Sequence, residues 1–108
     1  MKKKYRLRKN WEFSAVMKSK TQLINKYLVV YYKKADEFKV GITVPKKFAN
    51  AVGRNLYKRQ LKAMVRNSCL MNLPYEFVII ARKEFTQDSF DRKSKEIYKL
   101  FEKFRKNE

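Results

Sequence analysis

The residues best suited to chemistry in this sequence are cations that gather without acidic neighbours. Between Glu37 and Glu76 there is no Asp or Glu. An ordinary solvated helix mixes the two signs of charge, because opposite charges one turn apart stabilise each other. A one-signed stretch is instead suited to binding phosphate groups, through bidentate Arg contacts and Lys point charges. The basic residues of this stretch are Lys39, Lys46, Lys47, Arg54, Lys58, Arg59, Lys62 and Arg66.

Most of these cations fall on one side of a predicted helix over residues 50–71. At about 100° of rotation per residue, they and one Asn lie within about 140° of one another. Asn55 adds an amide that can hydrogen-bond a base edge or a 2′-hydroxyl. The pattern predicts a helix whose basic face binds RNA or DNA, with attachment to a membrane surface as the alternative. The basic face comprises Arg54, Asn55, Lys58, Arg59, Lys62 and Arg66, and the other side carries Val52, Leu56, Ala63, Met64, Leu70 and Met71.

Aromatic side chains close to the basic ones could stack on unpaired bases. Phe13 and Met17 are one helical turn apart and could line a groove. In a predicted strand over residues 27–32, Tyr27 and Tyr31 share one face because side chains alternate. One face of the sheet must look away from its covering helices, so we expect an exposed tyrosine beside that groove. Each ring taken alone is more commonly part of a core.

Composition sets the class of protein. The chain has 108 residues, enough for one domain over residues 1–108, with 28 Lys and Arg against 10 Asp and Glu. The formal charge of +18 calls for an anionic partner. No apolar run is long enough for a membrane span, and the basic start lacks the apolar segment of a secretion signal. We therefore expect a cytoplasmic protein with no membrane partner, and a mobile basic arm over residues 1–9.

The pattern of apolar residues predicts helix, two or three strands, long helix, strand and helix. Asn10 is the expected N-cap of the first helix, and residues 21–25 are the least distinct strand. This order predicts an α+β domain of two layers, in which helices pack on one face of a sheet of three or four strands. The remaining elements are predicted strands over residues 27–32, 38–44 and 77–81, the helix over 50–71, and a last helix from residue 86 or 88 to 105.

The long predicted helix contains a recognisable signature. Residues 48–62 read Phe-Ala-Asn-Ala-Val-Gly-Arg-Asn-Leu-Tyr-Lys-Arg-Gln-Leu-Lys. This segment closely resembles the Ala-Val-x-Arg-Asn-x-x-Lys-Arg core of the ribonuclease P protein family. The preceding Val-Pro-Lys-Lys, the opening Leu-Arg-Lys-Asn-x-x-Phe and the later Phe-Val-Ile-Ile-Ala-Arg are similar to the family in order and spacing. Tyr57 and Met17 depart from it, standing where an aliphatic residue and an aromatic residue are usual.

The resemblance implies an α-β-β-β-α-β-α sandwich with a mixed four-stranded sheet and a left-handed βαβ crossover, as in the second domain of the fifth protein of the small ribosomal subunit. It implies a subunit that binds a large catalytic RNA and helps to remove the 5′ leader from precursor tRNA. By the same resemblance, a groove lined by Phe13, Met17 and Tyr31 takes the leader. The residues that it assigns to the catalytic RNA are Lys46, Lys47, Arg54, Asn55, Lys58, Arg59, Lys62 and Arg66.

The chain itself is poorly equipped for phosphodiester hydrolysis. It has no His, and Cys69 is its only cysteine. Its carboxylates are not clustered in the sequence, whereas such hydrolysis favours bound metal ions. We therefore expect no catalytic residue, metal site or small-molecule cofactor in this chain, and Mg²⁺ held mainly by the RNA. A basic ribosomal or RNA-chaperone protein and a protein-only nuclease are the alternatives. Leader sequence preference, dimerisation and a metal at the leader junction stay open.

Overall fold

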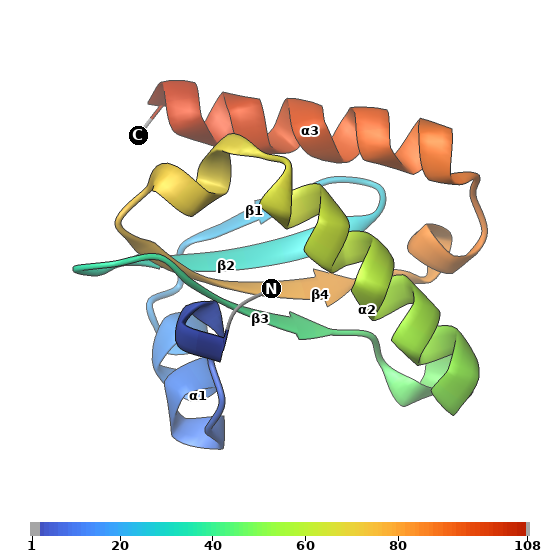
Figure 1. Ribbon diagram of the computed structural model, residues 1–108, viewed down its shortest axis with the longest axis horizontal. Coiled ribbons are helices and arrows are strands. Elements are labelled where there is room, and N and C mark those ends of the chain that lie inside the picture. The colour runs from blue at the N-terminus through green and yellow to red at the C-terminus, as the bar shows by residue number, and fades with distance from the viewer. Residues whose placement is uncertain (1–2, 108) are drawn as a thin grey trace.

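Four strands form one mixed sheet in the order β1-β2-β4-β3 (Figure 1). The structure, a computed structural model, describes residues 3–107. The antiparallel pairs are β1 with β2 and β2 with β4, whereas β3 runs parallel to β4. β-Branched and aromatic residues dominate the central strands, as expected for pleated, buried surfaces. The strands span Gln22–Ile24 (β1), Leu28–Lys34 (β2), Lys39–Thr43 (β3) and Tyr75–Ala81 (β4).

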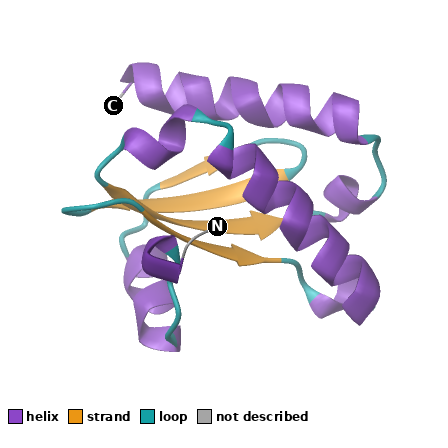
Figure 2. Ribbon diagram, in the orientation of Figure 1, coloured by secondary structure: helices purple, strands orange, loops and turns teal. Residues whose placement is uncertain are grey.

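Helices cover both faces of this sheet (Figure 2). The helices α2 (Ala51–Arg66) and α3 (Phe90–Asn107) bury apolar residues on one face, and α1 (Asn10–Lys18) packs on the other. In Figure 1, α2 passes in front of the sheet as the chain goes from β3 to β4, two strands that point the same way. This crossover is left-handed, against the usual right-handed rule. The order of elements, the mixed four-stranded sheet and the left-handed crossover expected from the family resemblance are confirmed. The helices were expected on one face of the sheet only, but α1 packs on the other.

Two hydrophobic clusters lie on opposite faces of the sheet. The larger one joins α2 and α3 to the sheet and includes Leu61, Phe77 and Phe101, each almost fully buried. The smaller one consists of Leu7, Val16 and Val78 and holds α1. Because α1 buries only one residue of its own, most of its surface stays accessible. No helix of the described residues is long and apolar enough to cross a membrane.

Part of the basic arm contacts the domain. Residues 3–9 run along the edge of β3, where Arg6 pairs with Val40 and the Leu7 amide donates to the Val40 carbonyl at 3.0 Å. The Tyr5 ring lies 5.9 Å from the Phe38 ring. Tyr5, Arg6 and Leu7 of the expected arm therefore contact the domain, and residues 1–2 lie outside the described part.

Two helix ends differ from the sequence prediction. Helix α2 stops at Arg66, because the Ser68 hydroxyl donates to the Val65 carbonyl at 2.7 Å and accepts from the Leu70 amide at 3.2 Å, which starts a separate 3-10 turn. At the start of α1, Asn10 is not the cap. The Glu12 carboxylate accepts from the backbone amides of Arg8 and Lys9, and these bonds lower its pKa.

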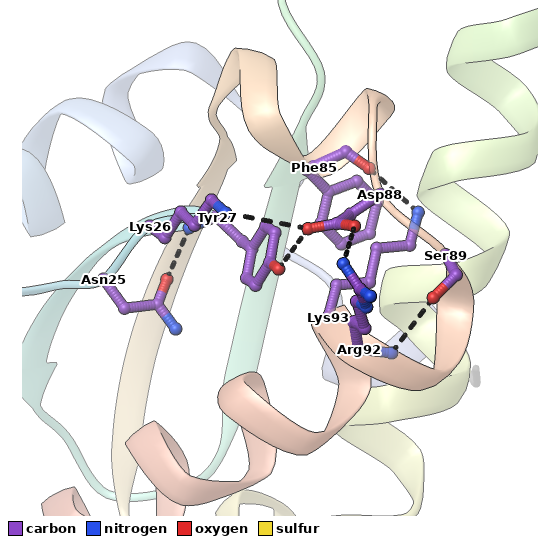
Figure 3. A network of polar contacts seen from close by, with 8 residues as sticks. All are labelled: Asn25, Lys26, Tyr27, Phe85, Asp88, Ser89, Arg92 and Lys93. Carbon is purple, nitrogen blue, oxygen red and sulfur yellow. Dashed lines mark hydrogen bonds and ion pairs between the residues drawn. The ribbon is translucent and has the colours of Figure 1, made fainter.

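A polar contact ties the start of β2 to the start of α3 (Figure 3). The Tyr27 hydroxyl donates to Asp88, which also lies 3.8 Å from the Lys26 ammonium and 3.9 Å from the Arg92 guanidinium. The bond from Tyr27 is the main cause that lowers the pKa of Asp88, and the two cations add to it. Because the folded state favours the ionised carboxylate, this contact stabilises the fold above the ordinary carboxyl pKa and is lost as pH falls through the lowered value.

Replacing Tyr27 with Phe is expected to lower the melting temperature by a few degrees near neutral pH. The difference from the wild type should shrink on acidification, because protonated Asp88 no longer gains from the hydroxyl. Thermal melts between about pH 7 and about pH 2 measure this. A difference that is the same at every pH would contradict the assigned bond.

Candidate nucleic-acid interface

Helix α2 is oriented by its ends and by its buried side. The Asn50 side chain caps it by accepting from the Gly53 amide at 2.9 Å. Leu61, Met64 and Val65 are fully buried against the sheet. Their burial turns the other side of the helix outward. On that side Asn55, Arg59 and Arg66 are exposed, and Arg54, Lys58 and Lys62 are half-buried.

The cations of α2 have no carboxylate partner among residues 3–107, whereas Arg92, Lys99 and Arg105 of α3 do. The acidic members of the ion pairs in this part of the chain are Asp88, Glu96 and Glu102, on α3 or just before it. In addition, the Arg54 Nε–H is buried without an acceptor from the protein. The basic face of α2 therefore keeps its full positive potential and an unused donor, which suits a polyanion.

Lys46 and Lys47 extend this basic surface. They lie in a short 3-10 turn, Lys46–Phe48, which connects β3 to α2, and both are exposed. The Lys47 ammonium lies 5.2 Å from the centre of the Phe48 ring. The first turn of α2 carries no acidic residue, so the positive end of the helix dipole adds to these charges. All the residues predicted to bind the catalytic RNA thus lie between residues 46 and 66, in this turn and in α2.

The aromatic residues predicted to line a groove meet on the face of the sheet that α1 covers. Strand register places Tyr31, Val78 and Gly41 in one row across β2, β4 and β3. Phe13 of α1 lies directly on Gly41, since a Cβ added there would come within 2.3 Å of its ring. Tyr31 and Phe13 both pack against the smaller cluster. Met17 is outside that cluster, with 40% of its surface exposed.

A hollow of about 160 Å³ at the outer edge of β3 joins the two predicted surfaces. Phe13 of α1 and the lysines of α2 line it together, although the sequence analysis placed them in separate surfaces. Tyr31 and Met17 do not line it. The basic side of α2 and the surface beside α1 therefore meet at this edge of the sheet. The lining residues are Arg6, Leu7, Phe13, Val40, Gly41, Ile42, Lys58 and Lys62.

Several residues of this surface were not predicted from the sequence. One row of the sheet beside α1 runs from Ile24 through Val29 and Ile80 to Thr43. Ile24 is 53% exposed, so this face of the sheet has an accessible apolar surface. The alternation predicted for residues 27–32 placed Tyr27 and Tyr31 on one face, but Tyr27 lies before β2 and packs in the larger cluster, whereas Tyr31 packs against the smaller one. The row itself needs the strand order, which the sequence does not contain.

The carboxylates within residues 3–107 do not form a cluster suited to a metal ion. Among the described residues, no group of three Asp, Glu, Cys or His side chains could hold a metal ion. Glu12 is occupied in capping α1, and Asp88 is held by a tyrosine and two cations. Asp36 and Glu37 lie beside Glu76 but among Lys33, Lys34 and Lys39. This donor set does not fit the hard oxygen cage that Mg²⁺ requires.

The family of the chain follows from sequence and structure comparison. Residues 1–105 match the family Ribonuclease P. The chain belongs to the ribonuclease P protein family. The ribonuclease P protein component of Mycoplasmopsis synoviae (strain 53) is 62% identical over 97% of this chain and 94% of its own length. That of Bacillus velezensis is 40% identical over 95% and 91%. Membership makes this chain a component of ribonuclease P, a ribonucleoprotein endoribonuclease of tRNA processing with an RNA partner.

Solved structures of the family share this fold. The ribonuclease P protein of Thermotoga maritima is 28% identical and superposes with a TM-score of 0.80 over 91% of this chain and 96% of its own. A mutant of the Staphylococcus aureus protein with defective mRNA degradation activity superposes with a TM-score of 0.85 at 27% identity, over 95% and 90%.

Proposed function

We propose that the basic face of α2 binds the catalytic RNA of ribonuclease P, and that the surface between α1 and the sheet takes the 5′ leader of precursor tRNA. The observation that carries this proposal is the hollow at the β3 edge, which Phe13 lines together with Lys58 and Lys62. An aromatic ring beside two cations fits a single-stranded nucleotide, which offers a base to stack and a phosphate to neutralise.

In this proposal the chemistry belongs to the RNA. The described residues supply no metal centre, so Mg²⁺ is held by the RNA and the substrate. The protein binds the leader. It also contributes positive charge, which screens phosphates that would otherwise repel each other. Weaker repulsion lets the RNA bind its substrate and its ions at lower Mg²⁺ concentration.

Replacing Tyr31 with Ala is expected to weaken binding of precursor tRNA by about tenfold, the loss of one stacked base. Binding of mature tRNA, which has no leader, and assembly with the catalytic RNA should change little. The measurement is the dissociation constant of the assembled holoenzyme for the two tRNAs.

Tyr31→Phe is the matched control, because it keeps the ring and removes only the hydroxyl. It should bind precursor as the wild type does. If Tyr31→Ala weakens both tRNAs equally, the ring supports the fold and not the leader. If neither variant changes anything, the leader lies elsewhere.

A further inference from the structure

Lys93 is a buried lysine without a carboxylate bonded to it. Only 2% of its surface is exposed, and its ammonium donates to the Phe85 carbonyl at 2.9 Å. Figure 3 shows the nearby Asp88 bonded instead to Tyr27, Lys26 and Arg92. Burial lowers the pKa of Lys93, and the charge of Asp88 opposes that shift only in part.

Such a group costs stability. A buried ammonium with one hydrogen bond loses more in hydration than it regains, and an apolar side chain of similar length often fills the same space at lower cost. The cost is greater in a chain with a formal charge of +18. A buried cation at this cost indicates that the charge of Lys93 contributes an interaction that an apolar side chain could not make.

The Lys93 ammonium also lies against two aromatic rings on other elements. Its ammonium lies 3.9 Å from the centre of the Phe85 ring, in the 3-10 turn Lys83–Thr86, and 5.0 Å from the centre of the Tyr57 ring, on α2. The Tyr57 ring meets the Phe85 ring edge-on at 5.9 Å, and its hydroxyl donates to the Thr86 carbonyl at 3.3 Å. One cation thus links α3, this turn and α2.

Tyr57 holds the part of α2 that carries the basic face. Before Leu61 no residue of α2 is buried, and Val52 and Leu56 are 79% and 45% exposed. Tyr57 is therefore the first side chain of the helix with ring and hydrogen-bond contacts to the rest of the domain. A small turn of the helix about its axis at this point would move the adjacent Lys58, and Arg54 and Arg59 with it.

We propose that Lys93 is a positioning residue for RNA binding: its ammonium, between the Phe85 and Tyr57 rings, fixes the face that α2 presents. The attraction of a cation to the face of a ring is directional, so it restrains the rotation of Tyr57 in a way that dispersion contacts alone do not. This inference rests on the proposed binding of the catalytic RNA by α2.

The test replaces Lys93 with Met, which keeps the length and removes the charge. Lys95→Met is the matched control, because it removes the same charge from an exposed position on the same helix. Arg59→Ala, on the RNA face itself, reports whether α2 binds RNA at all. For each full-length variant, the dissociation constant for the ribonuclease P RNA and the melting temperature are measured.

We expect Lys93→Met to weaken RNA binding about threefold to tenfold, as the removal of a buried cation–π interaction implies, while the melting temperature stays the same or rises. Lys95→Met should bind nearly as the wild type. Tyr57→Leu should reproduce the weaker binding, Tyr57→Phe should not, and the double variant Lys93→Met/Tyr57→Leu should be no worse than either single change.

Four results would overturn the inference. Equal affinity of Lys93→Met and Lys95→Met would show that only net charge matters. A lower melting temperature together with weaker binding would make Lys93 a structural residue. Normal binding by Arg59→Ala would remove the proposed function of α2, and this inference with it, whereas weak binding by Arg59→Ala and normal binding by Lys93→Met would remove the inference alone.

Discussion

A chain in which Arg54 and Arg59 are both replaced by Ala is expected to bind the catalytic RNA about a hundredfold more weakly than the wild type. Each arginine supplies a charge-assisted hydrogen bond worth about 1.5–3 kcal/mol, and neither has a carboxylate partner within residues 3–107. The plot of log affinity against log salt concentration should also become shallower by about 0.9 for each phosphate that the protein no longer neutralises. Filter binding over a series of salt concentrations measures both.

The matched control removes two arginines from α3. Arg92 and Arg105 are paired with Asp88 and Glu102 at 3.9 Å and 2.9 Å. The variant Arg92→Ala/Arg105→Ala lowers the net charge by the same amount, so a long-range effect of charge would weaken binding equally. We expect only a small decrease in affinity and an unchanged salt slope. If the two variants bind alike, the basic face of α2 has no special part in RNA binding.

Replacing Gly41 with Ala is expected to lower both the stability of the fold and the affinity for the leader. The added Cβ would lie 2.3 Å from Cε2 and 2.4 Å from Cζ of Phe13, so the ring must move. Crowding of this kind costs about 1–3 kcal/mol, and each kcal/mol lowers the melting temperature of a domain this small by about 4–8 °C. Because the displaced ring borders the β3 hollow, the preference for precursor over mature tRNA should fall as well.

The only other glycine of the chain provides the control. At Gly53 an added Cβ would meet Ala49 at 3.2 Å and the Asn50 side chain at 3.4 Å. A helical position also gains about 0.8–1 kcal/mol from Ala, so Gly53→Ala should be close to neutral. In the Gly41→Ala background, Phe13→Leu should restore stability but not the leader preference. Wild-type stability of Gly41→Ala alone would contradict the close approach of Phe13 to Gly41.

Local patterns predicted the parts of the fold that depend on local forces. The β-branched and aromatic run of β2 predicted a strand, and it lies at residues Leu28–Lys34. The acid-free stretch predicted the basic face of α2, which the structure turns outward. Features set by contacts between distant segments were not predictable in this way. The pairing of Arg6 with Val40 and the close contact of the Phe13 ring with Gly41 depend on how the arm and α1 cross the sheet.

Lys93 shows how a sequence signal can be present and still be missed. It lies three residues after Phe90 and four before Ile97, so it falls on the apolar side of α3. A lysine in that position is expected to extend its charge to solvent. In the structure the neighbouring rings and the Phe85 carbonyl hold it inside. The partners come from two other segments, and helical periodicity alone does not identify them.

Cleavage of precursor tRNA at low, physiological-range Mg²⁺ distinguishes a protein that assists a catalytic RNA from one that cleaves by itself or takes no part. The catalytic RNA alone, the protein alone and the two together are compared under the same conditions. We expect cleavage at the leader junction only when both are present, since the RNA supplies the chemistry and the protein supplies positive charge and binds the leader. No enhancement by the protein, or cleavage by the protein alone, would contradict this expectation.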